Sequence, residues 1–169
     1  MGDRRASGQN PADETRRDWE EELRAGLRPG YLVLGMGNRL RGDDGAGSLI
    51  AELLARRGLD RAFDCGEAPE NFLGTLHSHL PCDICVVDAV DFDAAAGTVR
   101  VFEGARFGAQ AVSTHAAGLG PLMEFLRAGG GLLRCVLAIQ PALVAFGDDL
   151  SDPVRRAVEQ IVSSPVWFE

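Results

Sequence analysis

The chain contains no lysine, and every one of its basic side chains, histidine apart, is an arginine. A P-loop needs a Gly-Lys-Ser/Thr sequence, because its lysine reaches the β- and γ-phosphates of the bound nucleotide. The absence of lysine therefore excludes a P-loop nucleotide-binding site.

Long apolar segments are absent as well. No apolar run approaches the roughly 20 residues that cross a bilayer, and residues 1–26 lack the apolar centre of a secretory signal. Four cysteines in a chain of 169 residues do not make a disulfide scaffold. We therefore expect a cytoplasmic protein.

Positive charge is scarce, since the net charge is −8. A surface that binds nucleic acid or an anionic membrane needs excess positive charge, so neither partner is expected. The apolar share of 46% is that of a globular protein, and the length suits one well-buried domain but not two ordinary ones. We expect this domain to be monomeric.

What the sequence does contain is organised around residues 31–50, YLVLGMGNRLRGDDGAGSLI. An apolar run enters a turn rich in Gly, Asn and Asp, and apolar residues at helical spacing follow, which predicts a strand, a loop and a helix. The loop is not a dinucleotide-binding fingerprint. That motif needs a third glycine three residues after Gly37, where this chain has Leu40.

Two neighbouring acids, Asp43 and Asp44, lie at the start of this predicted helix. Carboxylates at a helix N-terminus repel phosphate and attract a cation. One of the two is explained as a helix cap, worth ~1 kcal/mol. The second is left over, so Asp44 is a candidate functional residue, with capping as the alternative.

The rest of the chain alternates strands and helices. Residues 84–90 and 132–139 are apolar runs typical of strands buried on both faces, whereas residues 97–102 alternate and fit an edge or antiparallel strand. We expect strands at about 31–36, 61–64, 84–90, 97–102 and 132–139, and helices at about 11–26, 44–57, 69–80, 113–127 and 151–162.

This pattern predicts the α/β class. Residues 31–169 would form a single three-layer domain, a twisted central sheet of about five strands with helices on both faces. Residues 1–30 would form a partly disordered N-terminal extension whose short helix either packs on the domain or docks a partner.

Open α/β sheets bind ligands beyond the carboxyl ends of their strands, and three candidate residues should meet there. Asp44 follows the first strand, Asp88 ends an otherwise apolar strand, and His115 begins a helix after a loop. A buried Asp is costly unless it is paired or binds a metal. The helix dipole keeps His115 neutral and able to bind one. Such a set suits a divalent ion that also meets a substrate, with strand-end capping by Asp88 and a surface role for His115 as the alternatives.

A competing zinc site lies in the sequence HSHLPCDIC. C-x2-C is a known zinc spacing, but no glycine stands between the cysteines and the second falls within a predicted buried strand. The candidate ligands would be His77, His79, Cys82 and Cys85.

Nucleophilic catalysis has weaker support. Cys65 and Cys135 are possible thiol nucleophiles, and Ser113 stands near His115, but the chain has no G-x-S-x-G elbow.

Five motifs follow one another in the chain: GMGNRLRGDDGAG in the first loop, GEAPEN at 66–71, VDAVD at 87–91, STH at 113–115 and AIQPALVAF at 138–146. In this order they resemble the hydrogenase maturation endopeptidases. GDDGAG, APEN and IQP are most similar to the branch that serves hydrogenases of the formate-hydrogenlyase type. The resemblance covers about residues 31–162 and leaves residues 1–30 outside.

The resemblance implies a cytoplasmic endopeptidase, commonly classed as aspartic-type. It would remove the C-terminal extension from the precursor of a nickel-iron hydrogenase large subunit after nickel insertion. The family's metal-contacting acid, strand-closing Asp and helix-preceding His fall on Asp44, Asp88 and His115. Many relatives carry Glu in the first position, one methylene longer than Asp44. The nickel, or another divalent ion in its place, would arrive with the precursor.

The resemblance also suggests supporting roles. Asn38 and residues 45–47 would shape the floor of the crevice, and Gln140 would hydrogen-bond the substrate backbone. Two other functions stay open: a non-catalytic chaperone that binds nickel or the precursor, and a different metal-assisted hydrolase acting on a small molecule.

Overall fold

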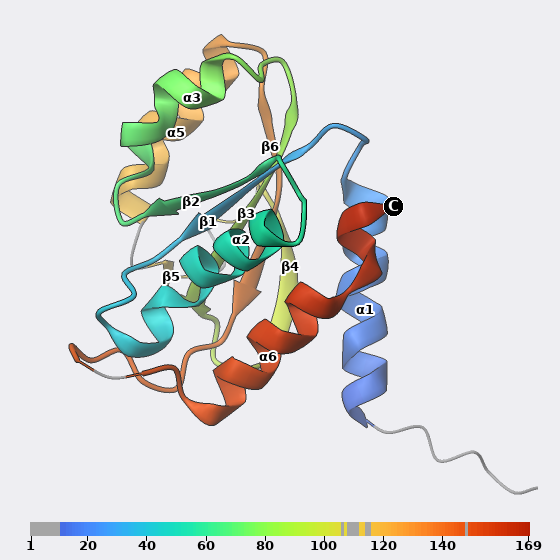
Figure 1. Cartoon of the computed structure of the whole chain (residues 1–169), viewed down its shortest axis with the longest axis vertical. Helices are drawn as coiled ribbons and strands as arrows, with labels where there is room; N and C mark the ends of the chain where they lie inside the picture. The colour runs from blue at the N-terminus through green and yellow to red at the C-terminus, as the bar shows by residue number, and fades with distance from the viewer. Residues whose placement is uncertain (1–10, 106, 108–111, 114–115, 148) are drawn as a thin grey trace, which may run out of the picture.

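The computed structural model describes residues 11–105, 107, 112–113, 116–147 and 149–169. Its centre is a twisted sheet of strand order β2-β1-β3-β6-β4 (Figure 1). Neighbouring strands are parallel except for β4, an antiparallel edge strand, and a short β5 (Val112–Ser113) pairs with the end of β3. The α/β class, the sheet and its antiparallel edge are thus confirmed. The five main strands are β1 (Leu32–Met36), β2 (Ala62–Gly66), β3 (Asp83–Asp91), β4 (Val99–Glu103) and β6 (Leu132–Ile139).

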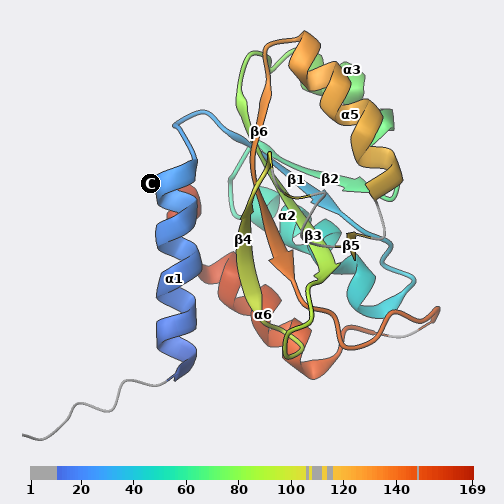
Figure 2. The same ribbon diagram turned by 180° about the vertical axis from the view of Figure 1, so that it is seen from behind.

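Helices cover both faces of the sheet (Figures 1 and 2). Alternate side chains of β1 serve two cores: Val33 packs on one face, and Leu32 and Leu34 pack on the other. With both faces covered, β1 and most of β3 are buried, as their apolar runs predict. The first face carries α1 (Pro11–Gly26), α2 (Ala46–Arg56) and α6 (Asp152–Ser163), and the second carries α3 (Leu73–His77) and α5 (Ala116–Ala128).

The helix ends differ from the predicted ones. The helix expected at 44–57 begins with a 3-10 turn, η1 (Gly42–Gly45), and the one expected at 69–80 is a 3-10 turn, η2 (Pro69–Phe72), followed by the short α3. The helix expected at about 113–127 begins at Ala116 as α5, and Ser113 pairs in β5 instead. Apolar periodicity fixes which face of a helix is buried, but not the hydrogen bonding of its ends.

α1 packs firmly on the domain. Its Trp19 and Leu23 are buried in the first core, and the helix runs alongside β4 (Figure 2). A helix ending near residue 26 is confirmed. The boundary at residue 30 stays a prediction, and so does the disorder expected for part of residues 1–30, because residues 1–10 lie outside the described residues. Within the described ranges, no helix combines the length and the apolar character needed to cross a membrane.

Two glycines set the distance between α2 and the sheet. A Cβ atom on Gly47 would lie 2.2 Å from the carbonyl oxygen of Val87 and 2.5 Å from that of Met36, and one on Gly35 would lie 2.2 Å from the oxygen of Gly47. The dinucleotide fingerprint uses its third glycine for the same purpose. Here the close approach is made at Gly47, which brings the start of α2 to the carboxyl ends of β1 and β3.

Candidate functional site

Asp44 lies in η1, at the carboxyl end of β1, with only 2% of its surface exposed. The backbone N–H of Asn38 donates a hydrogen bond to its Oδ2 at 3.1 Å. Gly37 (φ +132°) is required beside it, because a Cβ atom there would lie 1.8 Å from the carbonyl oxygen of Asp44. Asn38 and Gly37 thus shape the loop around Asp44.

Asp88 is fully buried in β3. Pairing between β1 and β3 ends at Gly35 and Val87, so Asp88 stands just beyond the last pair of these two strands, while it still pairs with Ala138 of β6. The expectation that Asp88 ends its strand is wrong, since β3 continues to Asp91. β5 and β6 supply partners for these last residues, and pairing of that kind is not visible in a local apolar pattern.

The structure brings Asp44 and Asp88 to the same edge of the sheet, because η1 contacts β3 directly. The third predicted ligand, His115, lies outside the described residues, just before the first residue of α5. Among the residues that the structure describes, no three His, Cys, Asp or Glu side chains are grouped to hold a metal ion. The three-ligand set therefore stays a prediction.

Asp43 has a structural role that the sequence did not reveal. Its Oδ2 accepts hydrogen bonds from the N–H groups of Ala142 (2.8 Å) and Leu143 (2.9 Å) and from the Ser151 hydroxyl (2.9 Å). Its Oδ1 accepts the Ser151 N–H at 2.7 Å. Asp43 is thus not a cap for α2. It fastens η1 to the loop after β6 and to the N-cap residue of α6.

Gln140 was expected to bind the substrate backbone, and the structure contradicts this. Its buried Oε1 accepts from the N–H groups of Phe92 (2.9 Å) and Ala94 (3.3 Å), and its Nε2 donates to Asp91 Oδ1 (3.1 Å) and the Pro141 oxygen (3.3 Å). Both ends of the amide are fully used within the protein. Gln140 therefore positions the turn that follows β3.

Arg39 is a second positioning residue that sequence reasoning missed. Its guanidinium donates to Ser48 Oγ at 2.7 Å and to Asp64 Oδ2 at 2.8 Å, and it pairs with Glu52. The hydrogen bond from Arg39 lowers the pKa of the Glu52 carboxyl. These contacts hold the first loop against α2 and β2. A lone arginine in a glycine-rich loop gives no local signal of this role.

The alternative sites fail on geometry. His79 packs edge-on against Phe63, and His77 lies against the ring of Phe125, so neither turns toward a common ion. Cys85 lies within β3 beside Cys135, its partner in β6. The hydrogen bond to Cys135 and burial raise the pKa of the Cys85 thiol well above its usual range. A zinc ligand has to be a thiolate, so this environment opposes metal binding.

The predicted thiol nucleophiles are disfavoured in the same way. Burial raises the pKa of the Cys65 thiol to about 12, and Cys135, in β6, is buried in the first core. A reactive cysteine needs a lowered pKa and partial exposure.

Comparison with known proteins assigns the family. The family model described as hydrogenase maturation protease (HycI) matches residues 49–165. Hydrogenase 3 maturation protease of Escherichia coli K12 is 32% identical over 133 residues, which cover 77% of this chain and 85% of that protein.

Solved structures agree with this assignment. The solution structure of the endopeptidase HycI from Escherichia coli has a TM-score of 0.65 at 31% identity and covers 78% of this chain and 86% of its own. The crystal structure of a NiFe hydrogenase maturation protease HycI from Thermococcus kodakarensis KOD1 has a TM-score of 0.67 at 26% identity and covers 84% and 92%. The chain therefore belongs to the hydrogenase maturation protease family.

Proposed function

We propose that this protein is the endopeptidase that removes the C-terminal extension from the precursor of a nickel-iron hydrogenase large subunit. We also propose that it recognises the precursor by its bound nickel. Asp44, Asp88 and His115 would complete the coordination of that nickel. The metal is then part of the substrate, and the protease needs no resident ion.

The observation that carries this proposal is the burial of two carboxylates, Asp44 and Asp88, at one edge of the sheet in a member of a protease family. Carboxylates taken out of water are costly unless they meet a positive charge or strong donors. Carboxylate and imidazole ligands both suit Ni²⁺. A site of this kind gains most when a cation arrives, which fits a cation delivered by the substrate.

Docking of the nickel would hold the scissile peptide in a fixed place. A water polarised by the cation or by a carboxylate of the site then attacks the carbonyl carbon, the C–N bond breaks, and the leaving nitrogen takes a proton from the attacking water. The products are the mature subunit with a new carboxylate and the released extension with a new amine. An unloaded precursor lacks the docking contact, so nickel serves as the signal that the precursor is ready.

The test is to incubate a nickel-loaded large-subunit precursor with this protein and to determine the mass of the large subunit. A decrease equal to the mass of the C-terminal extension supports the endopeptidase. Tight binding with unchanged mass would instead select the chaperone. His115→Ala and Asp88→Asn should each abolish the mass change, and full activity in either variant would remove that residue from the site.

A further inference from the structure

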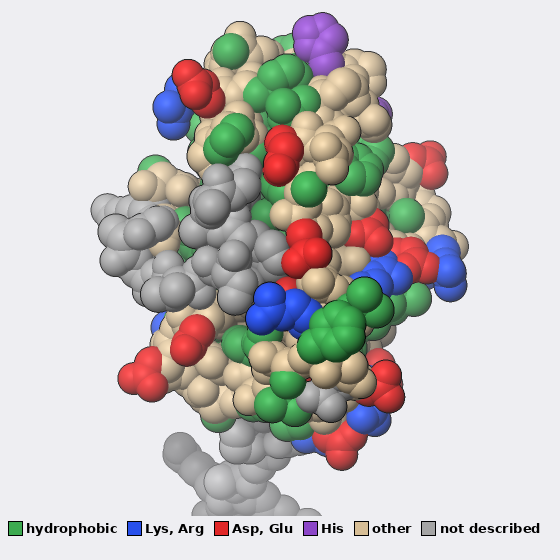
Figure 3. Space-filling view, turned by 90° about the vertical axis from the view of Figure 1, so that its left-hand side faces the viewer, with side chains coloured by type: hydrophobic (Ala, Val, Ile, Leu, Met, Phe, Trp, Pro, Cys, Tyr) green, Lys and Arg blue, Asp and Glu red, His purple; other side chains and the backbone are tan. Residues whose placement is uncertain are grey.

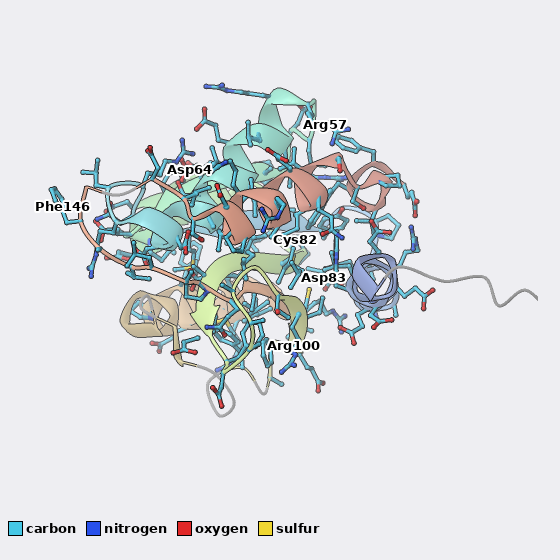
Figure 4. All side chains as sticks on the ribbon, turned by 90° about the horizontal axis from the view of Figure 1, so that it is seen from below. Arg57, Asp64, Cys82, Asp83, Arg100 and Phe146 are labelled. Carbon is cyan, nitrogen blue, oxygen red and sulfur yellow. The ribbon has the colours of Figure 1, made fainter. Side chains whose placement is uncertain are left out.

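An apolar surface lies beside the candidate site and has no role in the chemistry above. It is formed by Leu40, Arg41, Leu143 and Phe146, which we call the lip. Leu40, Leu143 and Phe146 are 63%, 49% and 79% exposed. Figure 4 shows Phe146 projecting away from the body of the molecule, and Figure 3 shows apolar side chains next to basic ones on the face that carries these loops.

The lip is one surface, although its residues come from distant parts of the chain. The N–H of Gly147 donates to the oxygen of Leu40 at 2.8 Å, and the N–H of Asp43 donates to the oxygen of Leu143 at 3.0 Å. The side chain of Asp43 fastens the same two loops, as described above. Hydrogen bonds between the two loops thus hold the residues of the lip near one another.

A gathering of exposed apolar side chains needs an explanation that isolated ones do not. Of the large apolar residues that are exposed in the described part of the chain, three are in the lip and the others are scattered. Leu132 is the first residue of β6, at the end of that strand away from residues 140–147, and Phe168 lies under the guanidinium of Arg57. The loop over residues 140–147 contains no charged residue.

The lip adjoins the site through Asn38. Its Oδ1 accepts the N–H of Leu40 at 2.8 Å, and its own N–H donates to Asp44 Oδ2 at 3.1 Å. Asn38 is therefore hydrogen-bonded both to Leu40 of the lip and to Asp44, the proposed nickel ligand. A substrate held at Asp44 would therefore lie close to the lip.

The positive charge of Arg41 indicates which kind of partner would bind at the lip. Arg41 is exposed and forms no ion pair with any described residue, Asp149 of the neighbouring loop included. In a protein of net charge −8 this cation at the edge of an apolar surface favours a partner that is apolar and carries a carboxylate.

We propose that the lip is the docking surface for a segment of the precursor, apolar and bearing at least one carboxylate, that flanks the scissile bond. Its apolar side chains cover Leu40, Leu143 and Phe146, and its carboxylate pairs with Arg41. This proposal rests on the proposed function, since it assumes that the protein substrate approaches Asp44 and Asp88. What the proposal adds to that function is the surface by which the enzyme selects its substrate.

The test compares matched variants in cleavage of the nickel-loaded precursor. Phe146→Ser and Leu40→Ser should each raise KM about tenfold with little change in kcat, because they remove binding that is equal in the ground and transition states. The controls are Phe168→Ser and Leu132→Ser, which also remove exposed apolar side chains, of 45% and 47% exposure, but away from the lip. They should leave KM unchanged.

A second comparison tests the charge. Arg41→Glu and Arg156→Glu change the net charge equally and replace exposed side chains. Only Arg41→Glu should raise KM, and Arg41→Lys should keep most of the affinity. Equal KM values for the two charge reversals would remove Arg41 from the docking surface.

Direct binding separates this proposal from the function itself. The fluorescently labelled precursor is titrated with the protein, whether or not cleavage occurs. Binding by the wild type that weakens in the lip variants supports the lip even if no cleavage is seen. Lip and control variants that bind equally overturn it, as does the absence of binding by the wild type. A wild-type dimer that the lip variants convert to a monomer would also overturn it, since the occupant would then be a second copy.

Discussion

The two edges of the sheet are built on different principles. At the carboxyl edge the chain buries Asp43, Asp44, Asp88 and Gln140 among loops. At the amino edge, α1, the start of β1 and the C-terminal turn η3 (Pro165–Phe168) surround a cavity of about 240 Å³ lined largely by apolar side chains, with the Arg24–Glu169 ion pair at its side. At the amino edge the acids are paired with arginines, Glu169 with Arg24 and Asp83 with Arg134, whereas the acids of the carboxyl edge are buried among loops.

Some of these buried polar residues support the loops, and others belong to the candidate site. Asp43 and Gln140 have their hydrogen-bonding groups used by neighbouring loops and hold those loops in place. Asp44, which accepts a hydrogen bond from Asn38, and Asp88 in β3 are the candidate ligands at the same edge. The contrast between edges is therefore also a contrast between neighbouring acids, and four predictions can break or sharpen it.

The largest effect is expected for the two candidate ligands. Asp88→Asn and Asp44→Asn keep the size of the side chain and remove its charge, so cleavage of the nickel-loaded precursor should fall at least about 100-fold, since even outer-shell partners of a metal ligand cost 10–100-fold. Both variants should fold. Asp44→Glu, which keeps the carboxylate, should retain measurable activity. Retention of full activity in Asp44→Asn would contradict the division proposed here.

Asp43→Ala should act on stability first. The loss of a buried acceptor strands the N–H groups of Ala142, Leu143 and Ser151, and the free energy of unfolding should fall by about 3 kcal/mol. Urea denaturation measures this, with Asp44→Asn as the neighbouring control. If both variants lost the same stability, the two acids would not have separate roles.

Gly47→Ala tests the close approach of α2 to the strand ends. The added Cβ would meet the Val87 and Met36 oxygens, and overpacking of this kind costs about 1–3 kcal/mol. Gly74→Ala in α3 is the control, because nothing lies within 4 Å of a Cβ there and alanine favours a helix. Thermal unfolding should show a lower midpoint for the first variant only.

The smallest effect concerns the turn after β3. The N–H of Asp93, followed by the Gln140 side chain, lowers the pKa of the Asp91 carboxyl. The stabilisation from this carboxylate is present above the unfolded value of about 3.9 and is lost as the pH falls through the lower folded value. Gln140→Leu should raise the pKa of Asp91 in a carboxyl NMR titration. An unchanged pKa would show that Gln140 does not hold this turn.

Much of this architecture could be predicted from the sequence. The continuous apolar runs gave the buried strands, and the alternation over residues 97–102 gave the antiparallel edge. The burial of Asp88 follows from its apolar neighbours, and the surplus acid in the first loop pointed to Asp44.

What could not be predicted depends on contacts between distant segments. Asp43 is joined to residues about 100 positions away, and no local pattern separates it from Asp44. The position of Gln140 at the end of an apolar strand suggested burial, but not which way its side chain points. Its hydrogen bonds to the turn after β3 were therefore missed. His115 was a candidate from its place before a predicted helix and again from the STH motif, and its placement stays a prediction.

The central proposal is that Asp44 and Asp88, at the carboxyl edge of the sheet, bind the nickel carried by the precursor. The most direct measurement is the rate of cleavage, followed by the mass of the large subunit, for the same precursor with and without nickel. The account predicts cleavage of the loaded precursor and none of the nickel-free form in the same time. Equal rates for the two forms would contradict it.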